Sequence, residues 1–313
     1  MTALIADSIY TAHDTGPGHP EQPARYTAVM DAISALPGLQ RIQPRPATDD
    51  EITLIHTRPY IETVQRDIAA RRTELSTGDT TLSPRSLEVA LMATGGVLNA
   101  VDAVISGNTR NAFCVVRPPG HHARPDQGMG FCIFNSIAVA ARYAQRHSGL
   151  GKVMIVDWDV HHGNGTQDAF YEDGSVFFFS THQWPWYPGT GPASETGDGP
   201  GKGTTMNRPF PAGAGRREIF GAFSEDLRRA ADAFKPELVL ISAGFDSRSG
   251  DPLGSFVLSD NDFADLTRLM LEIAGTHANG RLVSVLEGGY NLKGLAAAAT
   301  AHVKALVEGS KAK

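Results

Sequence analysis

The sequence has few cysteines, no excess of basic residues and no long apolar run. Only 2 of its 313 residues are cysteine, which excludes a disulfide framework and a cysteine-rich zinc module. The 34 aspartates and glutamates outnumber the 28 lysines and arginines, so the net charge of −6 offers no basic surface to a nucleic-acid partner. The first residues lack the features of a signal peptide, and no uncharged apolar stretch approaches membrane-spanning length. We therefore expect a cytoplasmic protein with no membrane partner.

Glycine and proline are the residues in excess. The 33 glycines and 19 prolines make up roughly 17% of the chain, against about 12% in an average protein. The hydrophobic share of 41% is too high for a disordered chain and is sufficient for a large buried core. Since the sequence contains no repeat and no long linker, we expect residues 1–313 to form a single domain.

Short apolar runs alternate with longer stretches of helical period. The runs are rich in β-branched and aromatic residues, as are the buried strands of a parallel sheet. They cover residues 113–116, 153–156, 176–180, 238–242 and 282–286. The helical stretches cover residues 86–105, 135–147, 216–234, 260–277 and 295–307. This alternation predicts an α/β fold in which helices cover a mainly parallel sheet.

Each predicted strand is followed at once by a polar segment that contains glycine or proline. These segments are 117–122, 157–165, 181–189, 243–246 and 287–290. Parallel sheets bind ligands beyond the carboxyl ends of their strands, so the histidines, aspartates and tyrosine of these segments should meet at one edge. The sequence therefore predicts an active site at that edge, and we expect the glycines of 189–203 to shape its rim.

Two carboxylates and one imidazole from these segments could bind a metal. Asp159 and His161 are two residues apart after a strand, so their side chains can point to the same side. Asp246, after another strand, could complete a set of three ligands that leaves a position for water, as in catalytic zinc sites. The same ligand types also suit Mn²⁺ and Fe²⁺. An isolated Asp-x-His pair more often caps a loop, and the polar ends of the other strands are what favour a metal site.

The pair His121-His122 could transfer the protons of a hydrolytic reaction. An imidazole of near-neutral pKa can take a proton from water and return one to a leaving amine. Asp157 and Asn164 are candidates for orienting the two rings, and the neutral Asn164 would raise the basicity of His122 less than an aspartate would. Tyr290 follows two glycines, and its hydroxyl could stabilise the oxyanion of a tetrahedral intermediate. Each motif alone has a plainer explanation, as loop histidines or as a packed tyrosine.

Together these segments resemble the zinc-dependent histone deacetylase superfamily, which includes acetylpolyamine amidohydrolases. The matching motifs are RPPGHHA at 117–123, GFC at 130–132, DWDVHHGNGT at 157–166, AGFD at 243–246, GDP at 250–252 and EGGYNL at 287–292. Asn164 within the third motif is similar to class II and bacterial class II-like members. The resemblance implies one catalytic domain over residues 1–313, with an arginase/deacetylase-like three-layer α/β fold and a central, mainly parallel sheet of about eight strands.

The resemblance also implies roles for individual residues. The implied zinc ligands, for one ion per chain, are Asp159, His161 and Asp246. The implied catalytic residues and their partners are His121, His122, Tyr290, Asp157 and Asn164. The implied walls of an acyl-lysine tunnel are Gly130, Phe131, Tyr187 and Leu253. A structural potassium ion is implied at Asp157, Asp159, His161 and Ser180, and an internal-channel arginine at Arg25. Apart from the resemblance, Trp184 and Trp186 could equally line a pocket or pack.

Three alternatives to an acyl-lysine deacylase use overlapping residues. Arginase, a relative in fold, has a two-manganese site with an Asp-x-Asp pair, and Asp246-Ser247-Arg248 lacks the second aspartate. An acetylpolyamine deacetylase would gain from a carboxylate at the tunnel mouth. The resemblance implies a glutamate just after Gly-Asp-Pro in the polyamine-preferring class II relatives, whereas this chain has Leu253 there. An inactive acyl-lysine binder would not need all three implied zinc ligands, both histidines and the tyrosine. We therefore predict zinc-dependent hydrolysis of N-acyl-lysine in a protein or peptide, with acetylpolyamines as the alternative substrates.

Overall fold

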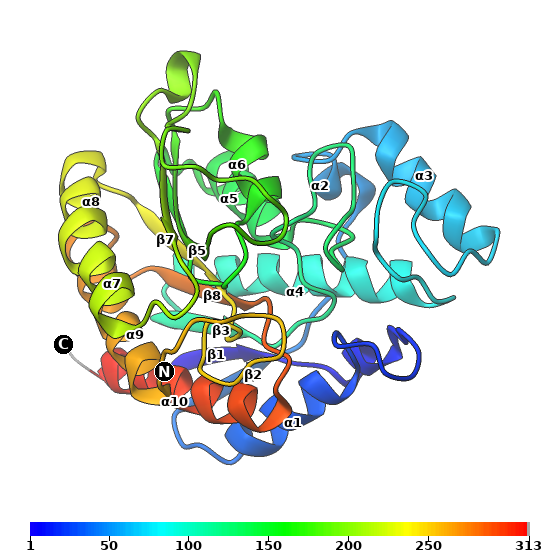
Figure 1. Cartoon of the computed structure of the whole chain (residues 1–313), viewed down its shortest axis with the longest axis horizontal. Helices are drawn as coiled ribbons and strands as arrows, with labels where there is room; N and C mark the ends of the chain where they lie inside the picture. The colour runs from blue at the N-terminus through cyan, green and yellow to red at the C-terminus, as the bar shows by residue number, and fades with distance from the viewer. Residues whose placement is uncertain (312–313) are drawn as a thin grey trace.

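Eight parallel strands form the central sheet of the computed structural model, which describes residues 1–311 (Figure 1). Their order across the sheet is β2-β1-β3-β8-β7-β4-β5-β6, and each neighbouring pair is parallel. The strands are β1 (Thr2–Ile5), β2 (Leu39–Ile42), β3 (Asn111–Cys114), β4 (Val153–Asp157), β5 (Val176–Gln183), β6 (Thr205–Phe210), β7 (Leu238–Ala243) and β8 (Leu282–Leu286).

Helices cover both faces of this sheet and complete three layers. One face is covered by α4 (Ser86–Ile105), α5 (Ser136–Ser148) and α6 (Asn164–Phe170). The other is covered by α1 (Ala24–Ile33), α9 (Asp260–His277) and α10 (Leu292–Lys311), with α7 (Arg216–Gly221) and α8 (Arg228–Phe234) packed on α9. A π-helical segment, Ala222–Leu227, joins α7 to α8. The remaining helical elements are α2 (Asp49–Ile52), α3 (Arg58–Ala69) and the 3₁₀ turns Ser8–Ala12 and Gly199–Gly201.

The predicted α/β fold with a parallel sheet of eight strands between helices is confirmed, and the five predicted strands are β3, β4, β5, β7 and β8. Periodicity missed β1 and both edge strands. β2 has the sequence LQRI and β6 has TMNRPF, and both are only partly buried. Neither therefore has the continuous apolar run of a strand that is buried on both faces. β1 is wholly buried, but its four residues are too few to show a period.

Helix α4 is a long apolar helix of the core. By length and composition it is apolar enough to cross a membrane, although Glu88 and Asp102 interrupt its uncharged run. However, 67% of that stretch is buried inside the protein, where α4 packs on α5 and against β1, β3 and β8. A helix buried on most sides is apolar all round, so packing in the core accounts for its composition.

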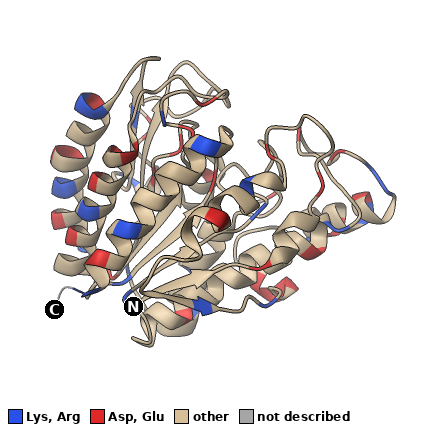
Figure 2. Cartoon of the chain, turned by 90° about the horizontal axis from the view of Figure 1, so that it is seen from below, with Lys and Arg blue, Asp and Glu red and all other residues tan. Residues whose placement is uncertain are grey.

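The outer helices carry charges of both signs. Figure 2 shows lysines and arginines interleaved with aspartates and glutamates along these helices. Some of them pair across helices, as Arg216 does with Asp262 and Arg228 with Glu272. Arg228 and Glu272 are both about half exposed, so this pair contributes little to stability, whereas Asp262 is largely buried.

A second, smaller group of buried side chains lies beside the main core, under α2 and α3. Its members are Ala47, Ile52, Tyr60, Ile61, Val64, Leu75, Leu82, Ala90, Ile133 and Phe134. The Tyr60 hydroxyl donates a hydrogen bond to the Ile133 carbonyl at 2.6 Å. Leu75 and Leu82 anchor both ends of a loop in the same group. This packing fixes loop 75–82 beside segment 128–134, next to the carboxyl edge of the sheet.

A buried ion cluster joins the N-terminal segment to two loops at that edge. The Glu21 carboxylate lies between Arg25 and Arg117, and all three side chains are 0% exposed. Arg117, which begins the loop after β3, donates to Glu21 Oε2 at 2.7 Å. Arg25 donates to the carbonyls of Glu287 and Gly289, which follow β8. Burial opposes ionisation of Glu21, but the charge and hydrogen bonds of Arg117, together with Arg25, lower its pKa to about 2.

Replacing Glu21 with glutamine should lower the free energy of unfolding by about 3–5 kcal/mol, because two buried guanidinium groups lose their shared counter-charge. The depressed pKa means that this stabilisation is present above the unfolded pKa of about 4.3 and is lost as the pH falls towards 2. Denaturant unfolding should therefore show a smaller difference between wild type and variant at pH 3 than at pH 7.

The matched control for this prediction is Glu88→Gln. Glu88 pairs with Arg85 on the surface, and both side chains are more than half exposed. Its replacement should change the free energy of unfolding by less than about 0.5 kcal/mol. An equally small effect of Glu21→Gln would contradict the role of the buried cluster.

Candidate active site

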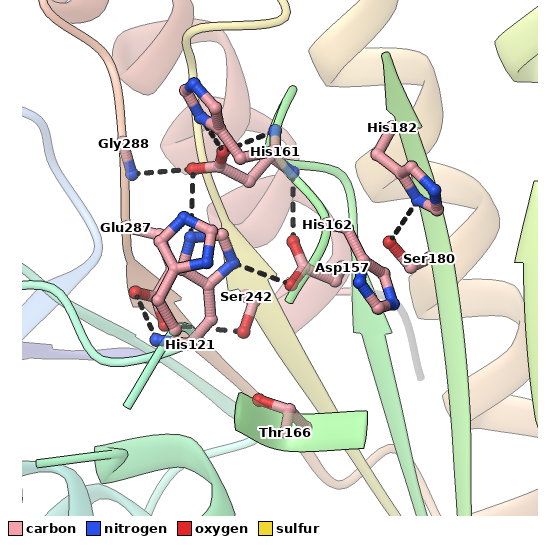
Figure 3. Close-up of polar contacts among 12 residues, drawn as sticks. His121, Asp157, His161, His162, Thr166, Ser180, His182, Ser242, Glu287 and Gly288 are labelled. Atoms are coloured by element: carbon pink, nitrogen blue, oxygen red, sulfur yellow. Dashed lines mark hydrogen bonds and ion pairs between the residues drawn. The ribbon is translucent and has the colours of Figure 1, made fainter. Parts of the chain in front are cut away.

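Polar side chains from neighbouring strand ends converge at the carboxyl edge of the sheet (Figure 3). Strands β3, β8, β7, β4 and β5 are adjacent in that order, so the segments that follow them form one continuous rim. Parallel α/β sheets place their ligand sites there. This rim contains His121 and His122 after β3, Glu287 and Tyr290 after β8, Asp246 after β7, Asp157 at the end of β4 with Asp159 and His161 after it, and Ser180 in β5.

Asp159, His161 and Asp246 form a compact, buried cluster. One potential ligand atom from each lies within 4.8 Å of the other two, and the three residues are 0%, 7% and 0% exposed. His161 Nδ1 is 2.9 Å from Asp159 Oδ1 and 3.3 Å from Asp246 Oδ2. The Gly288 N–H donates to Asp159 Oδ2, and the Val160 N–H donates to Asp246 Oδ1, both at 2.8 Å. The structure thus brings the three predicted metal ligands together.

The cluster has the properties of a divalent-cation site. Within residues 1–311 no hydrogen bond reaches Asp246 Oδ2, although this atom is buried. Burial and then the charge of Asp159 raise the pKa of Asp246 to about 7, so the second carboxylate charge needs compensation. A Cβ on Gly288 would lie 1.9 Å from Asp246 Oδ2, and a Cβ on Gly244 would lie 2.1 Å from Asp159 Oδ2. Two carboxylates and one imidazole suit catalytic zinc, and Mn²⁺ and Fe²⁺ also bind such sets.

His121 and His122 have adjacent rings, 4.0 Å between centroids, but different partners. His121 Nδ1 is 2.8 Å from Asp157 Oδ2, and His122 Nδ1 is 2.8 Å from Asn164 Oδ1. Burial favours the neutral form of His121, but nearby carboxylates, chiefly Asp157, outweigh it and raise the pKa well above its usual value. Burial and the charge of His121 lower the pKa of His122 well below its usual value. The pair therefore combines a charged and a neutral imidazole.

Glu287 holds the histidine loop against β8. Its Oε2 accepts the N–H of Gly120 at 2.7 Å and that of His121 at 3.1 Å, and the Ser242 hydroxyl reaches Oε1 at 3.3 Å. Burial raises its pKa to about 7. The sequence places Glu287 in a motif but does not indicate this role, because Gly120, His121 and Ser242 lie far from it along the chain.

Tyr290 lies in the same pocket as His122 and His161. Its ring has the Arg25 guanidinium 5.0 Å from its centroid and the Phe131 ring 6.0 Å away, edge-on. Burial raises the pKa of Tyr290 well above its usual value. The hydroxyl therefore keeps its proton at neutral pH and can act as a hydrogen-bond donor.

A pocket of about 240 Å³ leads to these groups. Its walls are Asp79, His122, Gly130, Phe131, His161, Trp186, Tyr187, Leu253 and Tyr290. The structure thus brings together the four predicted substrate-binding residues. The Tyr187 ring stands perpendicular to His122, with 5.2 Å between centroids, and forms one wall.

Two residues line this pocket that the sequence did not assign to it. Asp79 was not predicted at all, and for Trp186 the sequence left open whether it lines a pocket or packs. Asp79 accepts the Gly130 N–H at 2.7 Å, and the Tyr187 hydroxyl lies 3.4 Å from the same oxygen. No motif marks Asp79, which reaches the pocket only because the smaller core fixes its loop. Trp186 lines the mouth, and its indole N–H donates to the Leu253 carbonyl at 2.8 Å.

Loop 189–203 does not line this pocket, contrary to the expectation that its glycines shape the rim. A Cβ on Gly191 would lie 2.7 Å from both His162 and His182, beneath the site. Gly197 and Gly201 pack against Tyr171, at the amino end of β5. These glycines therefore permit close backbone packing away from the substrate pocket.

The four residues implied for potassium come from the end of β4, the segment that follows it and the middle of β5. Asp157 and Ser180 are partners in the register of the two strands. The Ser180 hydroxyl is 3.0 Å from His182 Nδ1, and Asp157 Oδ1 accepts the Asp159 N–H at 3.0 Å. Figure 3 shows Ser180 and His182 on the far side of Asp157 from His121.

The fold has three layers, with helices on both faces of a parallel sheet, and a buried Asp-His-Asp cluster lies beside the pocket. These features define a protein of the arginase/deacetylase class of α/β folds. The model of the histone deacetylase domain matches residues 19–306, and the chain belongs to the histone deacetylase family. The crystal structure of the HDA15 HD domain has a TM-score of 0.91 at 36% identity, covering 97% of this chain and 90% of that chain.

Relatives in this family carry several names. Histone deacetylase 10, chloroplastic, of Oryza sativa subsp. japonica is 42% identical, over 88% of this chain and 67% of its own length. A probable deacetylase of Archaeoglobus fulgidus is 36% identical, over 94% and 82%. Polyamine deacetylase HDAC10 of Homo sapiens is 38% identical, over 92% of this chain and 44% of its own length. The family supports deacetylase activity for this chain, and its members are zinc-dependent.

Removing one ligand or filling the space beside the ligands should abolish metal binding. His161→Ala deletes a ligand, and Gly288→Ala places a methyl group against both carboxylates. Elemental analysis of purified protein should find about one zinc per wild-type chain and well under half of that in either variant. The matched controls are His147→Ala on the exposed end of α5 and Gly275→Ala in α9, where a Cβ meets nothing within 4 Å. Full zinc retention in His161→Ala would refute the assigned ligands.

Proposed function

We propose that this protein hydrolyses the amide of N-acetyl-lysine in a protein or peptide with the help of one zinc ion. The observation that carries the proposal is the pocket of about 240 Å³, which is apolar along its walls and has His122, His161 and Tyr290 at its inner end. An alkyl-amine stem can lie between the Phe131 and Tyr187 rings while its acyl group reaches the polar groups. Enzyme pockets of this kind combine apolar walls with a few converging polar groups.

Asp159, His161 and Asp246 would hold the zinc ion, and the ends of β4 and β5 around Asp157 and Ser180 would hold a structural potassium ion. Zinc in such a site polarises a carbonyl and lowers the pKa of a bound water. The negative charge of the buried carboxylates supports both assignments.

The two histidines would have different roles, His122 in proton transfer and His121 in stabilising charge. The Asn164 amide oxygen accepts a hydrogen bond, so His122 Nδ1 carries the proton and the Nε2 lone pair is free. Because its pKa is low, His122 can take a proton from water at neutral pH. His121, paired with Asp157 and charged, stabilises negative charge beside it. The water oxygen forms the new bond to the carbonyl carbon. His122 then returns the proton to the leaving amine as the C–N bond breaks, which releases acetate and the free amine.

Tyr290 would stabilise the carbonyl oxygen as negative charge develops on it. Its phenol stays protonated because burial raises the pKa, and it faces the same pocket as His122. The Arg25 guanidinium beneath the ring fixes where the phenol lies. A donor already in place before the reaction costs no reorganisation during it.

The apolar Leu253 at the mouth favours a lysine stem over a polyamine. A polyamine carries a second cationic amine, which gains nothing from a leucine. Asp79 is the observation that supports acetylpolyamines as the second candidate, since its carboxylate also lines the pocket. It already accepts the Gly130 N–H, so its charge is partly engaged.

A kinetic panel decides between the two substrates. Metal-quantified enzyme should have a kcat/KM at least about tenfold higher for an acetyl-lysine peptide than for acetylspermidine. Leu253→Glu should narrow or invert that ratio, and Leu253→Met should leave it unchanged. A clear preference of the wild-type enzyme for acetylspermidine would show the substrate assignment to be wrong, and absence of turnover on either would favour an inactive binder.

Tyr290→Phe should reduce kcat on the acetyl-lysine peptide by about 10²–10³-fold, because one donor to the developing oxyanion is lost. KM should change little. Tyr143→Phe is the matched control, since the Tyr143 hydroxyl bonds Asp102 on α4 and lies outside the pocket. Near-normal turnover of Tyr290→Phe would overturn the role of the phenol.

A further inference from the structure

We propose that Asp251 is a positioning residue that couples the pocket mouth at Leu253 to the phenol of Tyr290. The proposal rests on the deacylase function above. It concerns how the mouth of the pocket and its inner end are held in fixed positions relative to each other. Asp251 belongs to the gate loop, residues 250–254, which carries Leu253. It does not line the pocket and does not belong to the Asp-His-Asp cluster.

One carboxylate bonds the backbone of two separate segments. Asp251 Oδ1 accepts the Leu253 N–H at 3.0 Å. Asp251 Oδ2 accepts the Tyr290 N–H at 2.7 Å and the Asn291 N–H at 3.1 Å. Hydrogen bonds to an ionised acceptor are stronger than neutral ones, so three of them on one side chain make a firm connection.

A return bond closes the connection between the two segments. The Asn291 side-chain amide donates to the Gly250 carbonyl at 2.9 Å. The gate loop and the Tyr290 segment therefore hold each other through two side chains, one from each. Two independent contacts between the same segments resist both sliding and rotation.

The gate loop and the Tyr290 segment need such a connection because glycines in both make their backbones conformationally flexible. Gly289 has φ +121° and Gly250 has φ +83°, both in the region that favours glycine. Gly288 cannot carry a side chain without meeting Asp246. Gly288 and Gly289 therefore add no side-chain packing before Tyr290. Arg25 holds the Gly289 carbonyl, and Asp251 restrains the Tyr290 N–H.

The far side of the gate loop is also fixed. The Trp186 indole N–H donates to the Leu253 carbonyl at 2.8 Å, so Leu253 is held through both its N–H and its carbonyl. A substrate that pushes Leu253 aside must then move Asp251, and Asp251 moves the Tyr290 backbone. Bulky amines should be rejected through a lower kcat rather than only a higher KM, since the phenol would be displaced.

The deciding experiment uses Asp251→Ser with the zinc-loaded enzyme and an acetyl-lysine peptide. Serine retains an acceptor for the Leu253 N–H in a turn of the same type but cannot also reach the Tyr290 segment. We expect kcat to fall by about 10–100-fold, because small displacements of a catalytic group cost that much. KM and zinc content should stay within about twofold of wild type. In the Tyr290→Phe background the same change should cost less than about twofold, because the phenol is already absent.

The controls separate this proposal from a general loss of structure. Asp198→Ser removes a carboxylate that accepts the Gly199 N–H in an exposed loop, and kcat should not change. Asp251→Asn, of the same size as aspartate, should lower kcat as Asp251→Ser does and is used if the serine variant does not fold.

Three outcomes would overturn the coupling. These are an unchanged kcat in a folded Asp251 variant, an equal loss in the Tyr290→Phe background, or failure of both variants to fold. Inactivity of the wild-type enzyme would instead reject the proposed function, so the two failures are distinguishable.

Discussion

Four buried carboxylates crowd the carboxyl edge of the sheet, and the rest of the site is arranged around the cost of their charge. Asp157, Asp159 and Asp246 are 0% exposed and Glu287 is 1% exposed. Burial raises the pKa of Asp157 to about 6 and those of Asp246 and Glu287 to about 7, so protein groups alone do not fully support their ionisation. Backbone N–H donors and the imidazoles of His121 and His161 offset part of this cost. A divalent cation on the Asp-His-Asp cluster would offset the rest.

The loops around these charges are held from outside by other buried ions. The cluster of Glu21, Arg25 and Arg117 connects the start of the histidine loop to the end of β8. Glu287 connects the same two loops from inside, through backbone N–H groups. The glycines 244 and 288 leave the carboxylates room where a side chain would not fit. The histidine pair and the phenol thus have defined places without a side chain in the way.

The sequence predicted the fold class and the members of the site because both depend on local order along the chain. Five buried strands are followed directly by polar residues, and a parallel sheet must bring such residues to one edge. The edge strands β2 and β6 have mixed sequences and gave no such signal. Glu21 and Arg117 are 96 residues apart, and Asp79 and Gly130 are 51 apart, so neither pairing is visible as a period. The glycines of 189–203 were assigned to the rim from composition alone, and composition does not indicate which end of a strand a loop covers.

The central claim is that the buried carboxylate cluster binds one divalent cation on which deacylation depends. Titrating metal-free protein with zinc in a calorimeter, and assaying each point on an acetyl-lysine peptide, tests it most directly. We expect one binding event near one zinc per chain, with activity rising in proportion to occupancy and reaching a plateau at the same equivalence point. Full activity in the metal-free protein, or activity that does not follow occupancy of this site, would contradict it.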